Sequence, residues 1–362
     1  MLIKRENMVD ILGSMVKTSR KSVSELFNMF KMEFAKDKAT FTFNNGQVYT
    51  KAKFNVKDGI EGVYYSEANK MYGLLKEIVE PEVEVDIKDN TFVIKTSKSE
   101  YRLQLCDGSS YPEFPEAHGI TWKMNKEKLM YGIKQVIYAT TNDGTILSSV
   151  KFELEKGSYR LVASNGFILV IQSVEDGELQ LEEPVEFTID IESVKDIVKL
   201  LSSVETETVE FSFDSKILTL RVNDGEIVVS YISDALEFPN YKTVLEKAVN
   251  KPHFVINPAA LINAIKRLLV LSEEYDYIKL SVEDDKLIVS TVQTHDSEGY
   301  EVIQLEEFYS KPEDVVLSGS NLMEILKHTV GLVEFTINGT LQPVYINNSK
   351  FGYEAVQMPI RT

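Results

Sequence analysis

The chain has 362 residues, of which 43% are hydrophobic and 26% are charged, and its formal net charge is −17. This composition is typical of a folded protein and excludes the collagen-like and disordered classes. No apolar run approaches the roughly 18–20 residues that a membrane span needs, and residues 1–6 lack the apolar block of a secretion signal, so we expect a cytoplasmic protein without membrane contact.

Amphipathic helices recur along the chain. Apolar residues at helical spacing predict helices over residues 6–18, 125–139 and 257–271, each entered from a short extended stretch. Asn125 is well placed as an N-cap, and Pro258 suits the first helical position. A second helix follows each of these roughly 60 residues later, over residues 66–79, 190–203 and 320–331. The pattern therefore indicates a threefold internal repeat.

Alternating apolar and polar residues between these helices predict strands, for example over residues 83–87, 209–213 and 280–282. Turn residues separate the strand candidates at 44–46, 88–90, 223–225 and 283–285, where Asn, Asp and Gly accept positive φ angles at low cost. The sequence therefore predicts an α+β fold with three similar domains, each with two helices packed on antiparallel sheets.

Two proline-containing segments, residues 110–115 and 236–241, suit extended connectors between domains. They divide the chain into three parts of nearly equal length. We therefore expect domains at residues 1–117, 118–245 and 246–362.

Three stretches, in this order within the repeat, match a known family: Arg-Leu-Val-Ala-Ser-Asn-Gly at 160–166, Phe-Pro-Asn-Tyr-Lys-Thr-Val-Leu at 238–245, and Met-Pro-Ile-Arg-Thr at 358–362. Over its full length the chain resembles the β subunit of bacterial DNA polymerase III, the sliding clamp. The resemblance implies a non-enzymatic, cofactor-free processivity factor for DNA replication. It would form a head-to-tail homodimer, closed into a ring that encircles double-stranded DNA and tethers a polymerase.

A net charge of −17 argues against DNA binding unless the charge is segregated. The predicted helices at 125–139 and 257–271 carry +2 each, those at 6–18 and 190–203 carry −1 each, and the other two are neutral. A mildly positive lining inside an acidic exterior suits sequence-independent enclosure of DNA. The alternative is that these cations are ordinary solubilising residues. The candidate DNA-facing residues are Lys17, Arg20, Lys21, Lys70, Lys76, Lys126, Lys134, Lys195, Lys199, Lys266, Arg267 and Lys327.

The resemblance also implies a hydrophobic pocket between the second and third domains, which binds short apolar or aromatic peptides of polymerases and clamp loaders. Its residues, carried over position by position, are Leu147, Ser164, Gly166, Phe167, Ile168, Leu169, Pro239, Thr243, Val244, Val356, Met358, Pro359, Ile360 and Arg361. Four positions depart from the family: Phe167 and Ile168 replace a usual His-Arg pair, Thr243 a common Arg, and Thr362 an apolar residue. The alternative is that residues 167–169 are simply a buried strand.

For the ring seam, we expect residues 95–103 to form a basic edge strand that the third domain of the partner covers. Opposite charges around a small apolar centre would set this contact. The candidate interface residues are Lys95, Lys98, Tyr101, Leu103, Val270, Leu271, Asp296, Glu298 and Glu301. The alternative is ordinary surface charge.

Two other functions stay open. A hydrolase or nuclease would need a catalytic constellation, but the chain has neither a nucleophile elbow nor a phosphate loop, and Cys106, with no base nearby, is expected to be a small strand residue. Its histidines have no metal-ligand spacing: His118, His253, His295 and His328. The second alternative is a clamp-fold paralogue, for instance from a mobile element, that binds or blocks partners without supporting replication.

Overall fold

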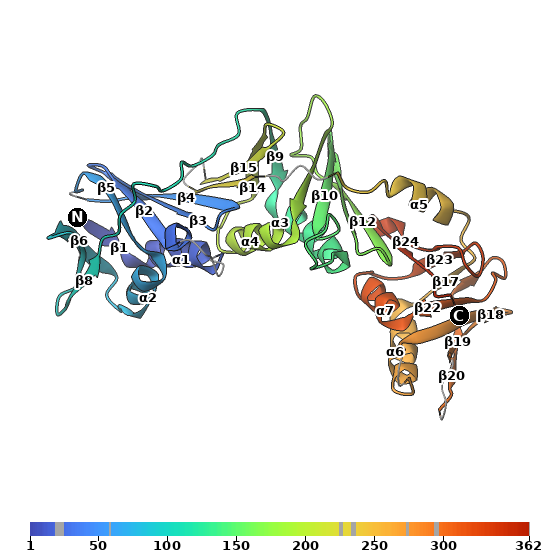
Figure 1. Ribbon diagram of the computed structural model, residues 1–362. Helices are drawn as coiled ribbons and strands as arrows, with labels where there is room; N and C mark the ends of the chain where they lie inside the picture. Colours follow the sequence, from blue (N-terminus) through green and yellow to red (C-terminus); the bar gives the residue numbers. More distant parts are fainter. Residues whose placement is uncertain are drawn as a thin grey trace. The chain divides into compact units, whose positions relative to one another are not determined.

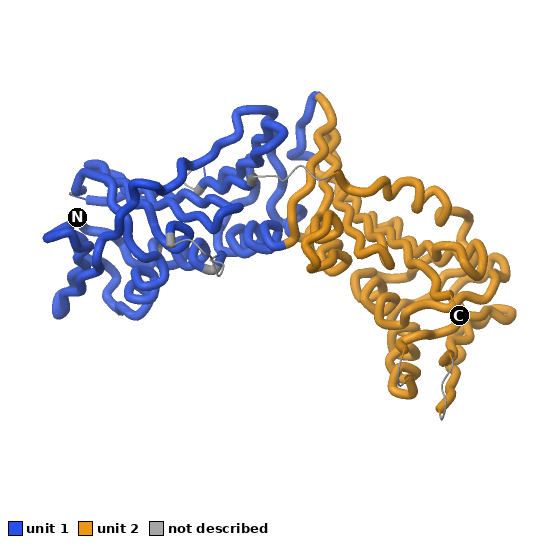
Figure 2. Tube along the Cα trace, viewed as in Figure 1, with its two compact units in different colours: residues 1–130, 177–182, 192–235 blue, residues 131–176, 183–191, 236–362 orange. Residues whose placement is uncertain are grey.

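The structure is a computed structural model that describes residues 1–18, 25–57, 59–223, 227–232, 237–272, 275–292 and 297–361. The chain folds into two compact units (Figure 2). Unit 1 contains residues 1–130, 177–182 and 192–235, and unit 2 contains residues 131–176, 183–191 and 236–362. The middle third of the chain thus contributes to both units.

One order of elements recurs three times: a strand, a helix, four strands, a helix and three strands, with one additional two-residue strand, β21 (Glu307–Phe308), in the third copy. The first copy contains β1 (Leu2–Lys4), α1 (Arg5–Lys17), β2 (Met29–Phe34), β3 (Lys38–Asn44), β4 (Val48–Asn55), β5 (Gly62–Glu67), α2 (Ala68–Glu77), β6 (Glu82–Lys88), β7 (Thr91–Lys95) and β8 (Glu100–Gln104). A short 3-10 helix, η1 (Glu25–Asn28), precedes β2.

The second copy contains β9 (Ile120–Asn125), α3 (Lys126–Val136) with η2 (Ile137–Ala139), β10 (Ser149–Glu155), β11 (Ser158–Ser164), β12 (Ile168–Glu175), β13 (Val185–Asp190), α4 (Ile191–Ser202), β14 (Thr208–Phe213), β15 (Ile217–Val222) and β16 (Ile227–Ile232). A further helix, α5 (Lys242–Ala248), lies in the segment that leads to the third copy.

The third copy contains β17 (Phe254–Ile256), α6 (Pro258–Leu269), β18 (Tyr277–Glu283), β19 (Lys286–Thr291), β20 (Tyr300–Gln304), the two-residue β21 (Glu307–Phe308), β22 (Val315–Ser318), α7 (Gly319–Lys327), β23 (Val333–Ile337), β24 (Val344–Asn348), η4 (Ser349–Phe351) and β25 (Tyr353–Gln357). The α+β prediction is confirmed.

Each unit is built on one long and one short antiparallel sheet. Unit 1 has the strand orders β5-β2-β3-β4-β16-β15-β14-β9 and β1-β6-β7-β8. Unit 2 has the orders β13-β10-β11-β12-β25-β24-β23-β17-β21 and β20-β19-β18-β22. The long sheets join neighbouring copies of the repeat, because β4 pairs with β16 (Thr50↔Val229) and β12 pairs with β25 (Leu169↔Val356).

Helices cover the sheets in pairs. In unit 1, α1 contacts α2, and in unit 2, α6 contacts α7 (Figure 1). Their apolar stripes are buried, as Leu12 and Met71 show for the first pair and Leu261 and Leu322 for the second. An amphipathic helix gains most of its stability from burying such a stripe, so the helical periodicity of the sequence predicts these elements well.

The predicted caps and turns are present where the structure describes them. Asn125 Oδ1 accepts a hydrogen bond from Lys128 N at 3.0 Å, and Asn257 Oδ1 accepts one from Ala259 N at 3.0 Å ahead of Pro258. Asp89 and Asp284 adopt positive φ angles in two of the predicted hairpins. In the predicted turn at 223–225, residues 224 and 225 lie outside the described residues.

Two predictions about the first third are wrong. Residues 95–103 are not one strand, because Thr96 N donates to Ser99 O at 2.8 Å and closes a turn between β7 and β8. The Thr96 hydroxyl fixes this turn by accepting hydrogen bonds from the amides of the two residues that end it, at 3.2 and 3.1 Å. Cys106 lies two residues after β8 and not within a strand.

No helix in the described part of the chain is long and apolar enough to cross a membrane. Nor do His, Cys, Asp or Glu side chains of the described residues gather in groups of three or more that could hold a metal ion.

Candidate functional site

The turn between β11 and β12 carries the first group of predicted pocket residues. Asn165 Oδ1 accepts hydrogen bonds from Phe167 N at 3.0 Å and Ile168 N at 2.9 Å. The Ser164 hydroxyl donates to Ile168 O at 2.7 Å, and Gly166 adopts a φ of 86°, which favours glycine. Side-chain and backbone bonds together therefore hold this turn in one shape.

The end of the chain lies against that turn. Leu169 pairs with Val356 at the junction of β12 and β25, and beyond this pair Met358 N donates to Phe167 O at 2.8 Å. Two residues later, Ile360 N donates to Val316 O at 2.8 Å. The C-terminal segment is thus bonded both to the turn before β12 and to β22. The sequence does not predict the role of Val316, because its backbone carbonyl accepts the bond and every residue type has such a carbonyl.

A buried apolar cluster includes the paired residues Leu169 and Val356 of these segments. It consists of Val162, Leu169, Ile171, Tyr241, Ala248, Tyr345 and Val356, with Phe238, Val244 and Leu245 packed against it. The structure therefore brings three of the predicted pocket residues together: Leu169, Val244 and Val356. A fourth, Leu147, lies beside the turn, with its Cδ1 atom 3.9 Å from where a Cβ on Gly166 would be.

The rim of this region is apolar and exposed. Phe167 is 63% exposed and Met358 is 38% exposed, although the backbones of both are hydrogen-bonded to each other. Ile168 and Leu169 are buried strand residues, as the alternative interpretation expects, but Phe167 is not. The remaining predicted residues differ in exposure: Pro239, Thr243 and Arg361 are exposed, and Pro359 and Ile360 are half-buried.

A buried carboxylate braces the connector beneath the pocket. Glu153, which is 4% exposed, accepts a hydrogen bond from the Tyr241 hydroxyl at 2.8 Å. Lys151 Nζ lies 3.1 Å and Arg160 Nη2 3.3 Å from its carboxylate oxygens. Burial raises the pKa of Glu153, but the Tyr241 hydrogen bond and the neighbouring cations outweigh burial and lower it overall. The carboxylate is therefore charged and compensated at neutral pH.

Helix α5 was not predicted. It covers the cluster with Val244, Leu245 and Ala248. A helix of seven residues has little stability of its own, so packing on the cluster determines it. Its apolar residues have helical spacing in the sequence, but the segment is too short for this spacing to distinguish a helix from a connector.

Most of the predicted DNA-facing cations whose side chains the structure describes form ion pairs within the chain. Lys70 pairs with Glu67 at 2.7 Å, Lys195 with Glu192 at 2.7 Å and Lys199 with Asp196 at 3.0 Å. Lys327 pairs with Glu324, and Arg267 Nε lies 2.6 Å from Glu301. Only three described candidates are exposed and make no ion pair with another described residue: Lys76, Lys134 and Lys266.

Lys126 departs from the expectation for a DNA-facing residue. Its side chain is 11% exposed, and its ammonium donates to Val204 O at 2.9 Å. An ammonium with so little exposure needs such an acceptor, which Val204 supplies two residues after α4, and Glu127 lies 3.4 Å from the same ammonium. Arg20 and Lys21, and also the side chain of Lys17, lie outside the described residues.

Three of the predicted seam residues lie on edge strands of the two short sheets. β8, with Tyr101 and Leu103, is one edge strand, and β20, with Glu301, is another. Tyr101 is exposed, and Val270 is exposed just after α6. The other candidates are placed as follows: Lys95 is half-buried, Lys98 and Glu298 are exposed, Leu271 is half-buried, and Asp296 lies outside the described residues.

Two seam charges already have partners. Lys95 Nζ lies 4.0 Å from Glu100, and Glu301 forms a two-point ion pair with Arg267, at 2.6 and 2.8 Å. Sequence reasoning missed the exposed apolar side chains of β20, Tyr300 and Val302. The sequence shows that these two residues alternate along a strand, but it does not show that this strand lies at the edge of a sheet.

Two histidines have structural partners. His328 Nδ1 lies 2.8 Å from Gln135 Oε1, and its ring stacks on Tyr138 with 4.3 Å between centroids. His253 Nδ1 accepts from Ile337 N at 3.1 Å. Burial lowers the pKa of both imidazoles. These contacts connect helices and strands and do not form a catalytic arrangement.

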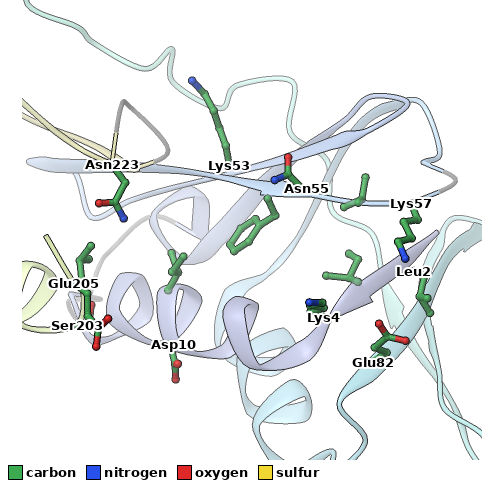
Figure 3. A pocket seen from close by; sticks show the side chains of 15 residues that line it. Leu2, Lys4, Asp10, Lys53, Asn55, Lys57, Glu82, Ser203, Glu205 and Asn223 are labelled. Atoms are coloured by element: carbon green, nitrogen blue, oxygen red, sulfur yellow. The ribbon is translucent and has the colours of Figure 1, made fainter.

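Unit 1 contains a hollow of about 660 Å³ that the sequence does not predict (Figure 3). Apolar side chains such as Phe54 and Val204 line it together with charged ones of both signs. The charged residues are Lys4, Lys53, Lys57, Asp10, Glu82 and Glu205. Its formal charges balance, so it favours neither an anionic nor a cationic ligand.

Comparison with known proteins agrees with this fold. No family model matches the chain. A β sliding clamp of Chlamydia trachomatis is 21% identical over 363 residues, covering 97% of this chain and 85% of the relative. A β sliding clamp of Mycoplasma genitalium is 21% identical over 346 residues, covering 89% of each.

Solved structures of low sequence identity share the fold. The DNA polymerase III β subunit of Thermotoga maritima has a TM-score of 0.88 at 21% identity, over 100% of this chain and 99% of that one. The DNA polymerase III subunit β of Pseudomonas aeruginosa has a TM-score of 0.90 at 18% identity, over 100% of both chains. Its fold and its full-length sequence similarity thus agree: both relate this chain to β sliding clamps, at low sequence identity.

Proposed function

We propose that the chain is a DNA sliding clamp, a non-enzymatic processivity factor that encircles duplex DNA and tethers a replicative polymerase and other partners. The observation that carries this proposal is the exposed apolar rim of Phe167 and Met358 above a buried cluster. Exposed apolar side chains next to a buried apolar cluster suit a short peptide with apolar or aromatic side chains. Met adapts its shape to several such peptides.

The charges of the observed helices support enclosure of DNA. With their observed bounds, α3 and α6 carry +2 each, α2 carries +1 and α1, α4 and α7 are neutral, in a chain of net charge −17. The acidic remainder would repel stray duplex, while the exposed lysines would interact with phosphates regardless of sequence.

Two of the sheet edges, those of β8 and β20, support a homodimer. An unpaired edge strand is a template for pairing with another chain, and β20 displays exposed Tyr300 and Val302. Each subunit has one β8 edge and one β20 edge. A head-to-tail contact between these different edges would close after two subunits, as a ring requires.

Primer extension tests the function. With the clamp loader and polymerase of the same organism, the purified chain is expected to lengthen the products and to sediment as a dimer. The paralogue alternative predicts the opposite result, because a protein that occupies partners without holding them on DNA would shorten the products. If the chain left the length of the products unchanged at every concentration tested, both the clamp and the paralogue function would be contradicted.

Replacing the three exposed and unpaired lysines is expected to weaken DNA binding. The Lys76→Ala/Lys134→Ala/Lys266→Ala variant should reduce the slope of log affinity against log salt by as much as about 3, since each phosphate contact contributes about 0.9. Fluorescence anisotropy with a duplex at several salt concentrations measures this slope.

The matched control removes three lysines that are already paired. Lys70→Ala/Lys195→Ala/Lys327→Ala changes the net charge by the same amount. It should change the slope less, because an ion-paired ammonium is less available to phosphate. Equal slopes for the two variants would show that only the overall charge matters.

A further inference from the structure

The turn beside the pocket has a counterpart in unit 1. Residues 44–48, Asn-Asn-Gly-Gln-Val, join β3 to β4 as residues 164–168, Ser-Asn-Gly-Phe-Ile, join β11 to β12. Asn45 Oδ1 accepts from Gln47 N at 3.1 Å and Val48 N at 2.9 Å, as Asn165 Oδ1 does from its own turn. The glycines that follow have φ angles of 95° and 86°. The two turns thus have the same shape.

In unit 1, the amide nitrogen of that asparagine is used inside the protein. Asn45 Nδ2 donates to Thr18 O at 3.0 Å and to Asp196 Oδ2 at 3.1 Å. Asn45 and Asp196 are both buried. This turn is therefore closed against the end of α1 and against α4.

In unit 2, the same groups are present but the bonds are not made. Thr140 follows η2 as Thr18 follows α1, and both hydroxyls donate to the carbonyl three residues earlier. Glu324 stands in α7 where Asp196 stands in α4, each three residues before its paired lysine. However, Asn165 Nδ2 has no hydrogen-bond partner among the described residues, and Asn165 is only half-buried.

The surroundings of Asn165 are those of the proposed pocket. Exposed Phe167 follows it in the same turn, and Leu147 lies beside Gly166. A ligand with an apolar side chain against Phe167, two residues from Asn165, would bring its main chain close to this turn. An amide donor amid apolar side chains pairs best with a neutral carbonyl, and it would fix the position of the ligand along the pocket.

We infer that the side-chain amide of Asn165 donates a hydrogen bond to a main-chain carbonyl of the bound peptide and is a specificity-determining residue. This inference rests on the proposed tethering of partners through the pocket. It assigns the two equivalent turns different tasks. Asn45 joins two copies of the repeat, and Asn165 binds a partner.

The Asn165→Asp variant tests this role with little change in shape. Aspartate keeps the Oδ1 acceptor that holds the turn but replaces the donor by a second oxygen. The probe is the tightest binder among overlapping synthetic 12-residue peptides of the organism's replicative polymerase. By fluorescence anisotropy, Asn165→Asp should bind it about 10-fold or more weakly than the unmodified chain, with an unchanged melting temperature.

Asn45→Asp is the matched control. It makes the same chemical change in the same turn, but it brings a carboxylate against buried Asp196 and removes the bond to Thr18. It should lower the melting temperature and leave peptide affinity unchanged.

The outcomes separate this inference from the function on which it rests. If no peptide binds the unmodified chain, the proposed tether fails, and the inference fails with it. If peptide binds Asn165→Asp and the unmodified chain equally, the tether stands and the inference is wrong. A drop in melting temperature for Asn165→Asp like that of Asn45→Asp would also overturn it, because the amide would then be structural.

Discussion

Replacing Glu153 with alanine is expected to lower the free energy of unfolding by about 3–5 kcal/mol, the usual effect of removing one partner from a buried ion pair. The change would leave the Tyr241 hydroxyl without its acceptor and Lys151 and Arg160 without their shared anion. Urea titration followed by circular dichroism at pH 7 measures the loss.

Glu186→Ala is the control from the same network. Glu186 also pairs with Lys151, at 2.8 Å, but its side chain is 53% exposed. Exposed pairs contribute about 0–1 kcal/mol, so this variant should unfold at nearly the same urea concentration as the unmodified chain. A Glu153→Ala variant that is no less stable than the control would mean that the network does not brace the connector.

The same carboxylate makes stability depend on pH. Its folded-state pKa is lowered, so its contribution is fully present above the unfolded value of about 4.3 and is lost as pH falls through the folded value. Between pH 5 and pH 3, the urea midpoint of Glu153→Gln should therefore fall less than that of the unmodified chain. If the urea midpoints of the two proteins fell by the same amount, Glu153 would not be the charged group that the structure indicates.

Deleting residues 358–362 is expected to weaken binding of a polymerase peptide by more than about 30-fold, the effect of losing a binding hot spot. The deletion removes the exposed Met358 and both main-chain bonds that hold the segment, to Phe167 and Val316. It leaves β25 whole, since that strand ends at Gln357. Fluorescence anisotropy measures the affinity, and sedimentation should show an unchanged dimer.

Arg361→Ala is the matched control for this deletion. Arg361 is exposed and makes no hydrogen bond or ion pair with another described residue, so its removal tests the charge of the segment alone. Its effect on affinity should be small. If the deletion variant, still folded, bound the peptide as tightly as the unmodified chain, the pocket would have to lie elsewhere.

The sequence predicts the fold where local patterns decide it. Helical spacing finds all six helices of the repeat, and asparagines with turn-forming neighbours mark the hairpins. The hairpin at 95–103 is missed because its turn consists of Thr, Ser and Lys without a glycine or asparagine. Helix α5 is missed because the cluster beneath it, and not its own length, makes it a helix.

The candidate site is harder to predict, because three distant stretches form it. Only the resemblance connected residues 164–169 with the C-terminal segment, and no periodicity could show that Met358 bonds to Phe167. Formal charge was also a coarse guide. Counting lysines on helices cannot separate Lys134, which makes no ion pair with a described residue, from Lys199, which neutralises a buried aspartate.

The shared sheets limit how the repeat can be divided. Because residues 48–52 of β4 pair with β16, excising the first third would expose an edge that includes Val48, Tyr49 and Thr50, all of which the fold buries. Such an edge invites pairing with other copies. Excising the last third would remove β25 and expose the edge of β12 in unit 2 in the same way. Each third of the chain thus shares a long sheet with its neighbour, and we expect an isolated third to aggregate through the edge that it exposes.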